Sequence, residues 1–180
     1  MQNNSLSTAT FGGGCFWCTE AIFQQLKGVE SVVSGYSGGE VANPSYREVC
    51  NGTTGHAEAI EIKFDPAVVS YEQLLQVFFA THDPTTLNRQ GADVGTQYRS
   101  VVFYHDEEQK KVAEKVVKEF VPTLWDDPAV TEIAPYAKFY PAEKYHQNYY
   151  NDNSEQGYCR IVINPKVQKF RKHYADWLKE

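Results

Sequence analysis

Residues 11–23, FGGGCFWCTEAIF, join an expected strand to an expected helix through a glycine turn. The overlapping segment 7–13, STATFGG, is typical of a short strand that ends in such a turn. The apolar residues after the turn have loosely helical spacing, and Gly28 is a typical C-terminal helix stop. A thiol, Cys15, therefore lies where a flexible turn meets the start of a helix.

Strand and helix patterns alternate along the rest of the chain, with short connections. The pattern predicts strands over 29–39, 56–66, 98–106, 130–140 and the residues just after 158, and helices over 70–84, 106–120, 141–150 and about 165–179. Ser70 with Gln73 has the spacing of a capping box, and Asp106 is a typical N-cap. Such an order predicts one sheet covered by helices, an α/β or α+β architecture.

The segment GHAEAIEIKF contains a carboxylate on the apolar side of an expected strand. Its residues alternate with period 2, which indicates a half-buried strand. Glu58 falls on the same side as Ile60, Ile62 and Phe64. A buried acid of this kind is costly unless it has a function or a partner.

Composition narrows the class of protein. The chain has 180 residues, 42% of them hydrophobic, and a formal net charge of -6. Those values suit one packed domain and argue against nucleic acid or an anionic membrane as the main partner. The chain has no apolar run of about 18 residues and no signal-peptide pattern, so we expect a cytoplasmic protein. Four cysteines in that compartment indicate catalysis, metal binding or idle thiols more than a disulfide framework.

The position of Cys15 is chemically suggestive. Free N–H groups and the positive end of the helix dipole favour a thiolate there and lower the thiol pKa. Phe16 and Trp17 could form an apolar pocket beside it. The C-x-x-C spacing with Cys18 also fits a thioredoxin-like redox pair or half of a zinc site. The pair lies too near the N-terminus for the first, and the other two cysteines are isolated, which leaves zinc a minor alternative.

A series of motifs resembles the A-type peptide methionine sulfoxide reductases. They are GCFWC, SGYSGG, NPSY, GHAEAIEI, DPTTLNRQGADVGTQYRSVVFY, YHQNYY and GYC, and they run from about residue 11 to 159. The resemblance implies a single catalytic domain over 1–180 with an α+β fold: a two-layer sandwich with a ferredoxin-like βαβ core and extended loops. It also implies thiol-dependent reduction of methionine S-sulfoxide, free or peptide-bound, in the repair of oxidised proteins.

The same resemblance implies a role for each site residue. Cys15 attacks the sulfoxide sulfur, and Phe16 and Trp17 hold the terminal methyl group. Glu58 protonates the sulfoxide oxygen, which fits a buried acid with a raised pKa. The polar side of the site consists of Tyr46, Tyr98 and Asp93. A sulfoxide needs a soft nucleophile on sulfur and a proton on oxygen, so the chemistry agrees with these roles.

Regeneration needs a second thiol to convert the Cys15 sulfenic acid to a disulfide. Cys159, in NSEQGYCRIV, resembles the family's resolving cysteine, and the adjacent glycine indicates a mobile loop. Cys18 is the competitor, but an i, i+3 pair near a helix start is often poorly placed for a disulfide. Cys50 lies in REVCNG, which is expected to form a short helix, and Cys50 is interpreted as structural. His146 is expected to be a structural hydrogen-bonding group.

No cysteine follows Cys159, so thioredoxin is expected to reduce the Cys15–Cys159 disulfide directly, with dithiothreitol as a substitute in vitro. No bound cofactor or metal is expected, and the molecule is expected to be a monomer. Two other classes of function remain open from the residues alone. One is a general thiol-disulfide oxidoreductase, and the other is a cysteine-based zinc module.

Overall fold

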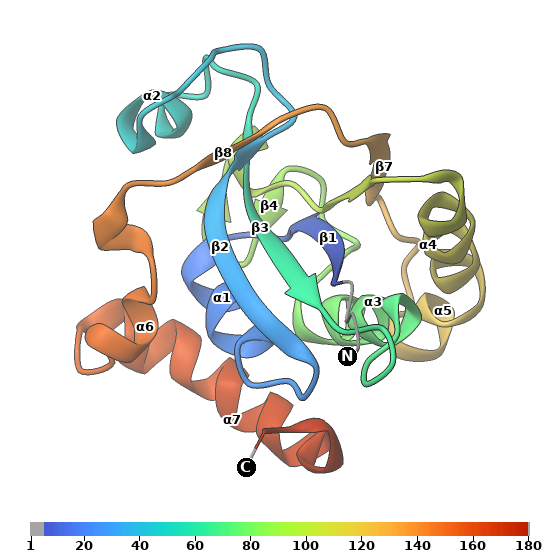
Figure 1. Ribbon diagram of the computed structural model, residues 1–180. Coiled ribbons are helices and arrows are strands. Elements are labelled where there is room, and N and C mark those ends of the chain that lie inside the picture. Colours follow the sequence, from blue (N-terminus) through green and yellow to red (C-terminus); the bar gives the residue numbers. More distant parts are fainter. Residues whose placement is uncertain (1–5, 180) are drawn as a thin grey trace, which may run out of the picture.

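The computed structural model describes residues 6–179 and has a six-stranded sheet at its centre (Figure 1). The strands lie in the order β7-β6-β1-β3-β2-β8. Their bounds are β1 Ser7–Gly12, β2 Val29–Ser37, β3 Ala57–Phe64, β6 Val101–Tyr104, β7 Glu132–Pro135 and β8 Phe139–Pro141. Two further short strands, β4 (Arg89–Gln90) and β5 (Asp93–Val94), pair only with each other as a hairpin.

The four inner strands have ferredoxin-like topology. Two β-α-β units, β1-α1-β2 and β3-α3-β6, interleave to give the order β6-β1-β3-β2, with every neighbouring pair antiparallel. The fold class predicted by the family resemblance is therefore confirmed. β7 extends one edge parallel to β6, and β8 extends the other edge antiparallel to β2.

The expected strand over 130–140 is thus wrong as a single element. Its two halves, β7 and β8, lie at opposite edges of the same sheet, and the chain crosses between them. β7 ends at Pro135, a residue that has no N–H to continue a ladder. Local alternation cannot distinguish one long strand from two short ones on different edges, because each half has strand character.

The helix expected over 141–150 is wrong: the segment contains the end of β8, a 3-10 turn over Lys144–His146 and only the start of a short helix at Tyr149. The segment stays extended because β8 pairs with β2 and the Gln147 side chain binds the Ser34 backbone.

The helices of the structure otherwise follow the expected segments, with some shifts in their ends. Their bounds are α1 Phe16–Phe23, α2 Tyr46–Cys50, α3 Tyr71–Thr81, α4 Glu107–Glu119, α5 Val121–Leu124, α6 Tyr149–Asp152 and α7 Asn164–His173. The predicted capping box at Ser70 and the Asp106 N-cap are confirmed. α1 ends well before Gly28, whose φ of +89° serves the turn into β2 and not the helix end.

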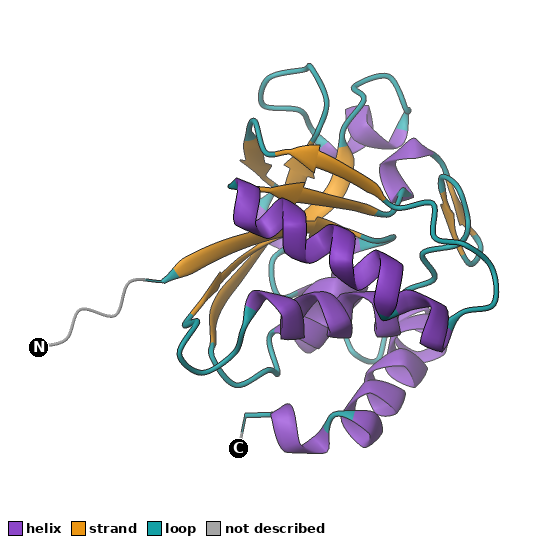
Figure 2. Cartoon of the chain, turned by 90° about the vertical axis from the view of Figure 1, so that its right-hand side faces the viewer, coloured by secondary structure: helices purple, strands orange, loops and turns teal. Residues whose placement is uncertain are grey.

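The main core lies between one face of the sheet and the helices. In Figure 2 the strands form one layer and the long helices lie beneath it. Phe11 from β1 and Ile60 from β3 pack in this core with Ile22 from α1 and Phe78 from α3. The Phe11 and Phe78 rings stack at a centroid distance of 4.8 Å. Glu58 projects from β3 into this same layer, as the alternation predicted, and is 1% exposed.

The C-terminal segment differs from the prediction. Residues Cys159–Ile163, expected as a strand, form a π-helical turn that runs directly into α7. Their buried side chains recur at helical spacing with those of α7: Cys159, Ile163, Val167 and Phe170. The run of β-branched residues suggested a strand, but packing of this one face against the core favours a helix. α7 ends at His173, short of the expected 179, and a 3-10 turn, Ala175–Trp177, follows.

Within residues 6–179, none of the helices has the length and apolar character needed to cross a membrane.

Candidate active site

Cys15 lies at the junction of β1 and α1, as the N-cap residue of the helix (φ -66°, ψ 126°). The turn before it runs very close to its neighbours. Gly14 has a φ of +86°, and a Cβ there would lie 2.6 Å from the Gln90 side chain. A Cβ on Gly13 would lie 2.8 Å from the Phe78 ring. The glycines therefore let the backbone pack tightly while leaving the Cys15 side chain partly exposed.

Glu58 lies directly beside this helix start. The backbone N–H of Phe16 donates to Glu58 Oε1 over 3.1 Å, and Oε2 is buried with no hydrogen-bond partner among residues 6–179. Burial raises the pKa of this carboxyl to about 8, and the negative charge of Asp93 adds to that effect. The acid therefore keeps its proton near neutral pH and has one oxygen free to donate it.

Two tyrosine hydroxyls approach the same carboxyl group. Tyr46 begins α2, and Tyr98 ends a 3-10 turn over Thr96–Tyr98. Burial, followed by the negative charge of Glu58, raises the pKa of both hydroxyls above the usual tyrosine range. Both therefore remain protonated and can donate hydrogen bonds. The structure thus brings together Tyr46, Tyr98 and Glu58, which are distant in sequence.

Asp93 lies on the small β4–β5 hairpin. Its Oδ2 accepts a hydrogen bond from the Tyr158 hydroxyl over 2.7 Å. Its charge also raises the pKa of Glu58. Asp93 therefore connects the polar side of the site to the C-terminal segment that carries Cys159.

Phe16 and Trp17 form an aromatic wall beside Cys15. Phe16 is fully buried, with its ring near those of Tyr36 and Tyr46 at centroid distances of 5.7 and 6.4 Å. Trp17 is partly exposed and stacks on Tyr149 at 3.7 Å. An apolar group that approaches Cys15 would meet this wall.

Hydrogen bonds from residues 143–148 hold the aromatic wall in place. The sequence did not mark these residues as functional. Glu143 accepts from the Tyr36 hydroxyl and the Tyr46 N–H, each over 2.8 Å. The Trp17 indole donates to His146 Nδ1 over 3.1 Å, as expected for a structural histidine. The Asn148 N–H donates to the buried carboxylate of Glu20. Glu20 lies in the apolar helix pattern, so its burial could have been noticed, whereas nothing marks Glu143.

The expected lowering of the Cys15 pKa is wrong for this state. A hydrogen bond with the Cys18 thiol, burial and the charge of Glu58 together raise the Cys15 pKa. The N–H of Trp17 at the helix start does lower it, as the sequence predicted, but by less. Cys18 has the opposite shift: its pKa is lowered, first by the hydrogen bond from Cys15 and then by Lys166, against the effect of burial.

The remaining thiols lie on two sides of the site. All four cysteines fall within residues 6–179 and are free thiols. Cys159 is 0% exposed and begins the π-helical turn, so the expectation of a mobile loop does not describe this state. Cys50 ends α2 next to the Tyr46 hydroxyl, and burial raises its pKa. The predicted short helix around Cys50 is confirmed.

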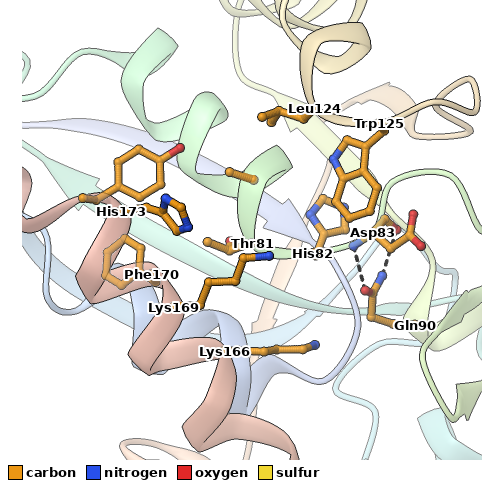
Figure 3. Close-up of a pocket in the computed structure, with 12 residues that line it drawn as sticks. Thr81, His82, Asp83, Gln90, Leu124, Trp125, Lys166, Lys169, Phe170 and His173 are labelled. Atoms are coloured by element: carbon orange, nitrogen blue, oxygen red, sulfur yellow. Dashed lines mark hydrogen bonds between the residues drawn. The ribbon is translucent and has the colours of Figure 1, made fainter.

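A cavity of about 680 Å³ opens behind the glycine turn, between the end of α3 and α7 (Figure 3). His82 and Gln90, which support Gly13 and Gly14 from behind, form part of its wall. Lys166 and Lys169 from α7 line it as well, together with Trp125. None of the site residues predicted from the sequence lines this cavity. One lining residue, Lys166, affects the site, because its charge lowers the pKa of Cys18.

Among residues 6–179, no group of three or more His, Cys, Asp or Glu side chains is arranged to hold a metal ion. The zinc alternative therefore finds no set of ligands in this part of the chain.

Comparison with known proteins shows the family of this chain. Residues 7–178 match the family model described as peptide methionine sulfoxide reductase. Peptide methionine sulfoxide reductase MsrA of Sulfolobus acidocaldarius is 55% identical, over 95% of this chain and 97% of that protein. The reduced form of Mxr1 from Saccharomyces cerevisiae has a TM-score of 0.79 at 36% identity, and the match covers 87% of this chain and 90% of Mxr1.

A second structure of Mxr1, in complex with Trx2, has a TM-score of 0.57 at 26% identity and covers 82% of this chain and 87% of Mxr1. Neither alternative class, the general disulfide oxidoreductase or the zinc module, is supported by these matches. The chain belongs to the peptide methionine sulfoxide reductase family, in its MsrA branch, and is a thiol-dependent oxidoreductase that reduces methionine sulfoxide.

Proposed function

We propose that Cys15 and Glu58 carry out the sulfoxide step together. The Cys15 sulfur attacks the sulfoxide sulfur, the oxygen is transferred to Cys15 as a sulfenic acid, and methionine leaves. Glu58 supplies a proton to that oxygen during the transfer and recovers the proton given up by the thiol. The observation that carries this proposal is the geometry of Glu58: one oxygen is held by the Phe16 N–H, and the other is buried and unpartnered.

The remaining site residues bind the two ends of the reacting group. Tyr46 and Tyr98 donate hydrogen bonds to the sulfoxide oxygen, as donors do in an oxyanion hole. Burial raises the pKa of Glu58, and the charge of Asp93 adds to that effect. Phe16 and Trp17 receive the terminal methyl group.

This arrangement selects the epimer of the substrate. The aromatic wall and the oxygen-binding hydroxyls fix two of the three substituents on the sulfoxide sulfur. Only one epimer can then present that sulfur to Cys15. We expect turnover of the S epimer alone, whether in a peptide or in free methionine sulfoxide. Chiral separation of the unreacted sulfoxide from a racemic mixture measures this directly. Equal consumption of both epimers would contradict the proposed binding of the methyl group and the sulfoxide oxygen.

The cycle closes through an intramolecular disulfide that includes Cys159, which thioredoxin then reduces; dithiothreitol substitutes in vitro. The solved complex of Mxr1 with Trx2 supports a thioredoxin partner. We also propose that residues 1–180 act as one catalytic domain, as a monomer in the cytoplasm, and that the substrates are oxidised proteins and free methionine sulfoxide. A thiol-disulfide oxidoreductase would reduce insulin disulfides as well, so an insulin assay without sulfoxide should show no turnover.

A further inference from the structure

Cys15 and Cys18 occupy a special pair of positions, the N-cap and the third residue of α1. The same pair of positions recurs at α2, where Ser45 and Glu48 form a capping box. There the Ser45 hydroxyl accepts from the Glu48 N–H over 3.1 Å, and the Glu48 carboxylate accepts from the Ser45 N–H over 2.9 Å. Ser70 and Gln73 at α3 do the same. Side chains at these two positions therefore lie on the same side of the helix start.

The expected obstacle to a Cys15–Cys18 disulfide applies inside a helix and not at its N-cap. Helical residues three apart have Cβ atoms about 5–6 Å apart, whereas a disulfide needs about 4 Å. Cys15 has extended backbone angles (φ -66°, ψ 126°), so it can turn its side chain without breaking the helix. The Cys18 N–H already donates to the Cys15 carbonyl over 3.1 Å, which holds the two residues together.

Cys18 also shares a buried core with Cys159. Cys18 is 4% exposed and Cys159 is 0% exposed, and both belong to the core beneath α1. The rings of Tyr158, the residue before Cys159, and Trp17 meet edge to face at a centroid distance of 5.9 Å, which places the start of the π-helical turn beside the first turn of α1. Burial raises the pKa of the Cys159 thiol, and the charge of Cys18 raises it further. Cys18 is therefore held against Cys15 by a backbone hydrogen bond and lies in the same core as Cys159, close enough for its charge to affect the Cys159 thiol.

Cys18 has the character of an attacking thiol. Its pKa is lowered although it is buried, because Cys15 donates a hydrogen bond to it and Lys166 brings a positive charge. Lys166 belongs to α7 and lines the cavity behind the glycine turn (Figure 3). A lowered pKa increases the thiolate fraction, and the thiolate is the form that attacks a sulfenic acid or disulfide.

We propose that Cys18 is the first resolving thiol and relays the disulfide from Cys15 to Cys159. The proposal rests on the proposed function, because it begins from the Cys15 sulfenic acid. The Cys18 sulfur attacks the Cys15 sulfur, the S–O bond breaks, and one water leaves with the Cys18 proton. The Cys159 sulfur then attacks Cys18, which forms the Cys18–Cys159 disulfide and releases Cys15 as a thiol. The thioredoxin dithiol finally reduces that disulfide and becomes a disulfide itself.

The test is a single turnover of reduced enzyme with a peptide that contains methionine S-sulfoxide. Four proteins are compared: the parent, Cys18→Ser, Cys159→Ser and, as a matched thiol control, Cys50→Ser. Methionine peptide, remaining thiols, dimedone-trapped sulfenic acid and disulfide-linked peptides are measured in each. The burst of methionine peptide also shows that each variant is folded.

In Cys159→Ser we expect a Cys15–Cys18 link and the loss of two thiols. In Cys18→Ser we expect dimedone-trapped Cys15 to rise at least about tenfold over the parent, and thioredoxin-dependent turnover to fall by a similar factor. Cys50→Ser should form the same disulfide as the parent. A Cys159→Ser protein that keeps a Cys15 sulfenic acid beside a free Cys18 would overturn the relay.

A Cys18→Ser protein that forms Cys15–Cys159 as fast as the parent forms its disulfide would also overturn it. In both cases the methionine burst remains, so the sulfoxide chemistry stands while the relay fails. An absent burst in the parent itself would instead overturn the proposed function, and the relay with it. If Cys18→Ser alone gives no burst, Cys18→Ala repeats the measurement with a small apolar side chain that suits the buried position.

Discussion

Cys15→Ser is expected to abolish methionine formation. A serine hydroxyl is a far weaker nucleophile at neutral pH than a thiol, and it cannot form the sulfenic acid or disulfide that the cycle requires. The measurement is single-turnover conversion of a methionine sulfoxide peptide. A variant that keeps even about a tenth of the parent rate, a loss of only ~1.4 kcal/mol in barrier, would contradict the assignment of Cys15 as the nucleophile.

Cys15→Ser should leave the fold intact, so the loss of activity would come from the missing thiol and not from unfolding. Cys15 makes no side-chain capping bond to α1, whereas serine is among the best N-cap residues. We therefore expect the free energy of unfolding of Cys15→Ser to equal or exceed that of the parent, by up to about 1 kcal/mol. Denaturant unfolding measures this. Cys50→Ser, which also replaces a partly buried thiol by a hydroxyl, is the matched control for general effects of the substitution.

Much of the site could be predicted because local pattern and chemistry agreed. The alternation of β3 placed Glu58 on the buried face, and the structure adds the raised pKa that this burial implies. The glycine turn placed Cys15 at a helix start, as observed. These are properties of a few consecutive residues, and tertiary packing does not change them.

Other features depended on contacts between distant segments. The pKa of Cys15 is set by Cys18 and Glu58 more than by the helix start, so the dipole argument gave the wrong direction. Gly157 lies two residues before Cys159 and predicted a loop, but Cys159 is buried in the core with residues that follow it at helical spacing. Glu143 accepts a hydrogen bond from the Tyr46 N–H, which is 97 residues away in sequence. No local sequence pattern predicts such a contact.

Glu58→Gln is expected to slow the sulfoxide step by about 10²–10⁴-fold, the usual contribution of a positioned general acid. Glutamine keeps the size of the side chain and can still accept from the Phe16 N–H, but it has no proton to give. Iodoacetamide should still alkylate Cys15, and no more slowly than in the parent. The charge of Glu58 is one cause of the raised Cys15 pKa, so its removal favours the thiolate.

The pH profile separates an acid from a structural carboxylate. Glu58 has a pKa of about 8, so its protonated form is present below that pH and is lost as the pH rises through it. The single-turnover rate of the parent should therefore fall above about pH 8. The Cys15 thiolate has the opposite dependence, because its fraction grows with pH. The rate of Glu58→Gln should no longer fall above about pH 8 but should still rise with the thiolate fraction, and it should be much lower than that of the parent throughout.

If Glu58→Gln has the parent's rate and the parent's pH profile, the proton comes from another group, and the buried, unpartnered oxygen of Glu58 has a structural role only.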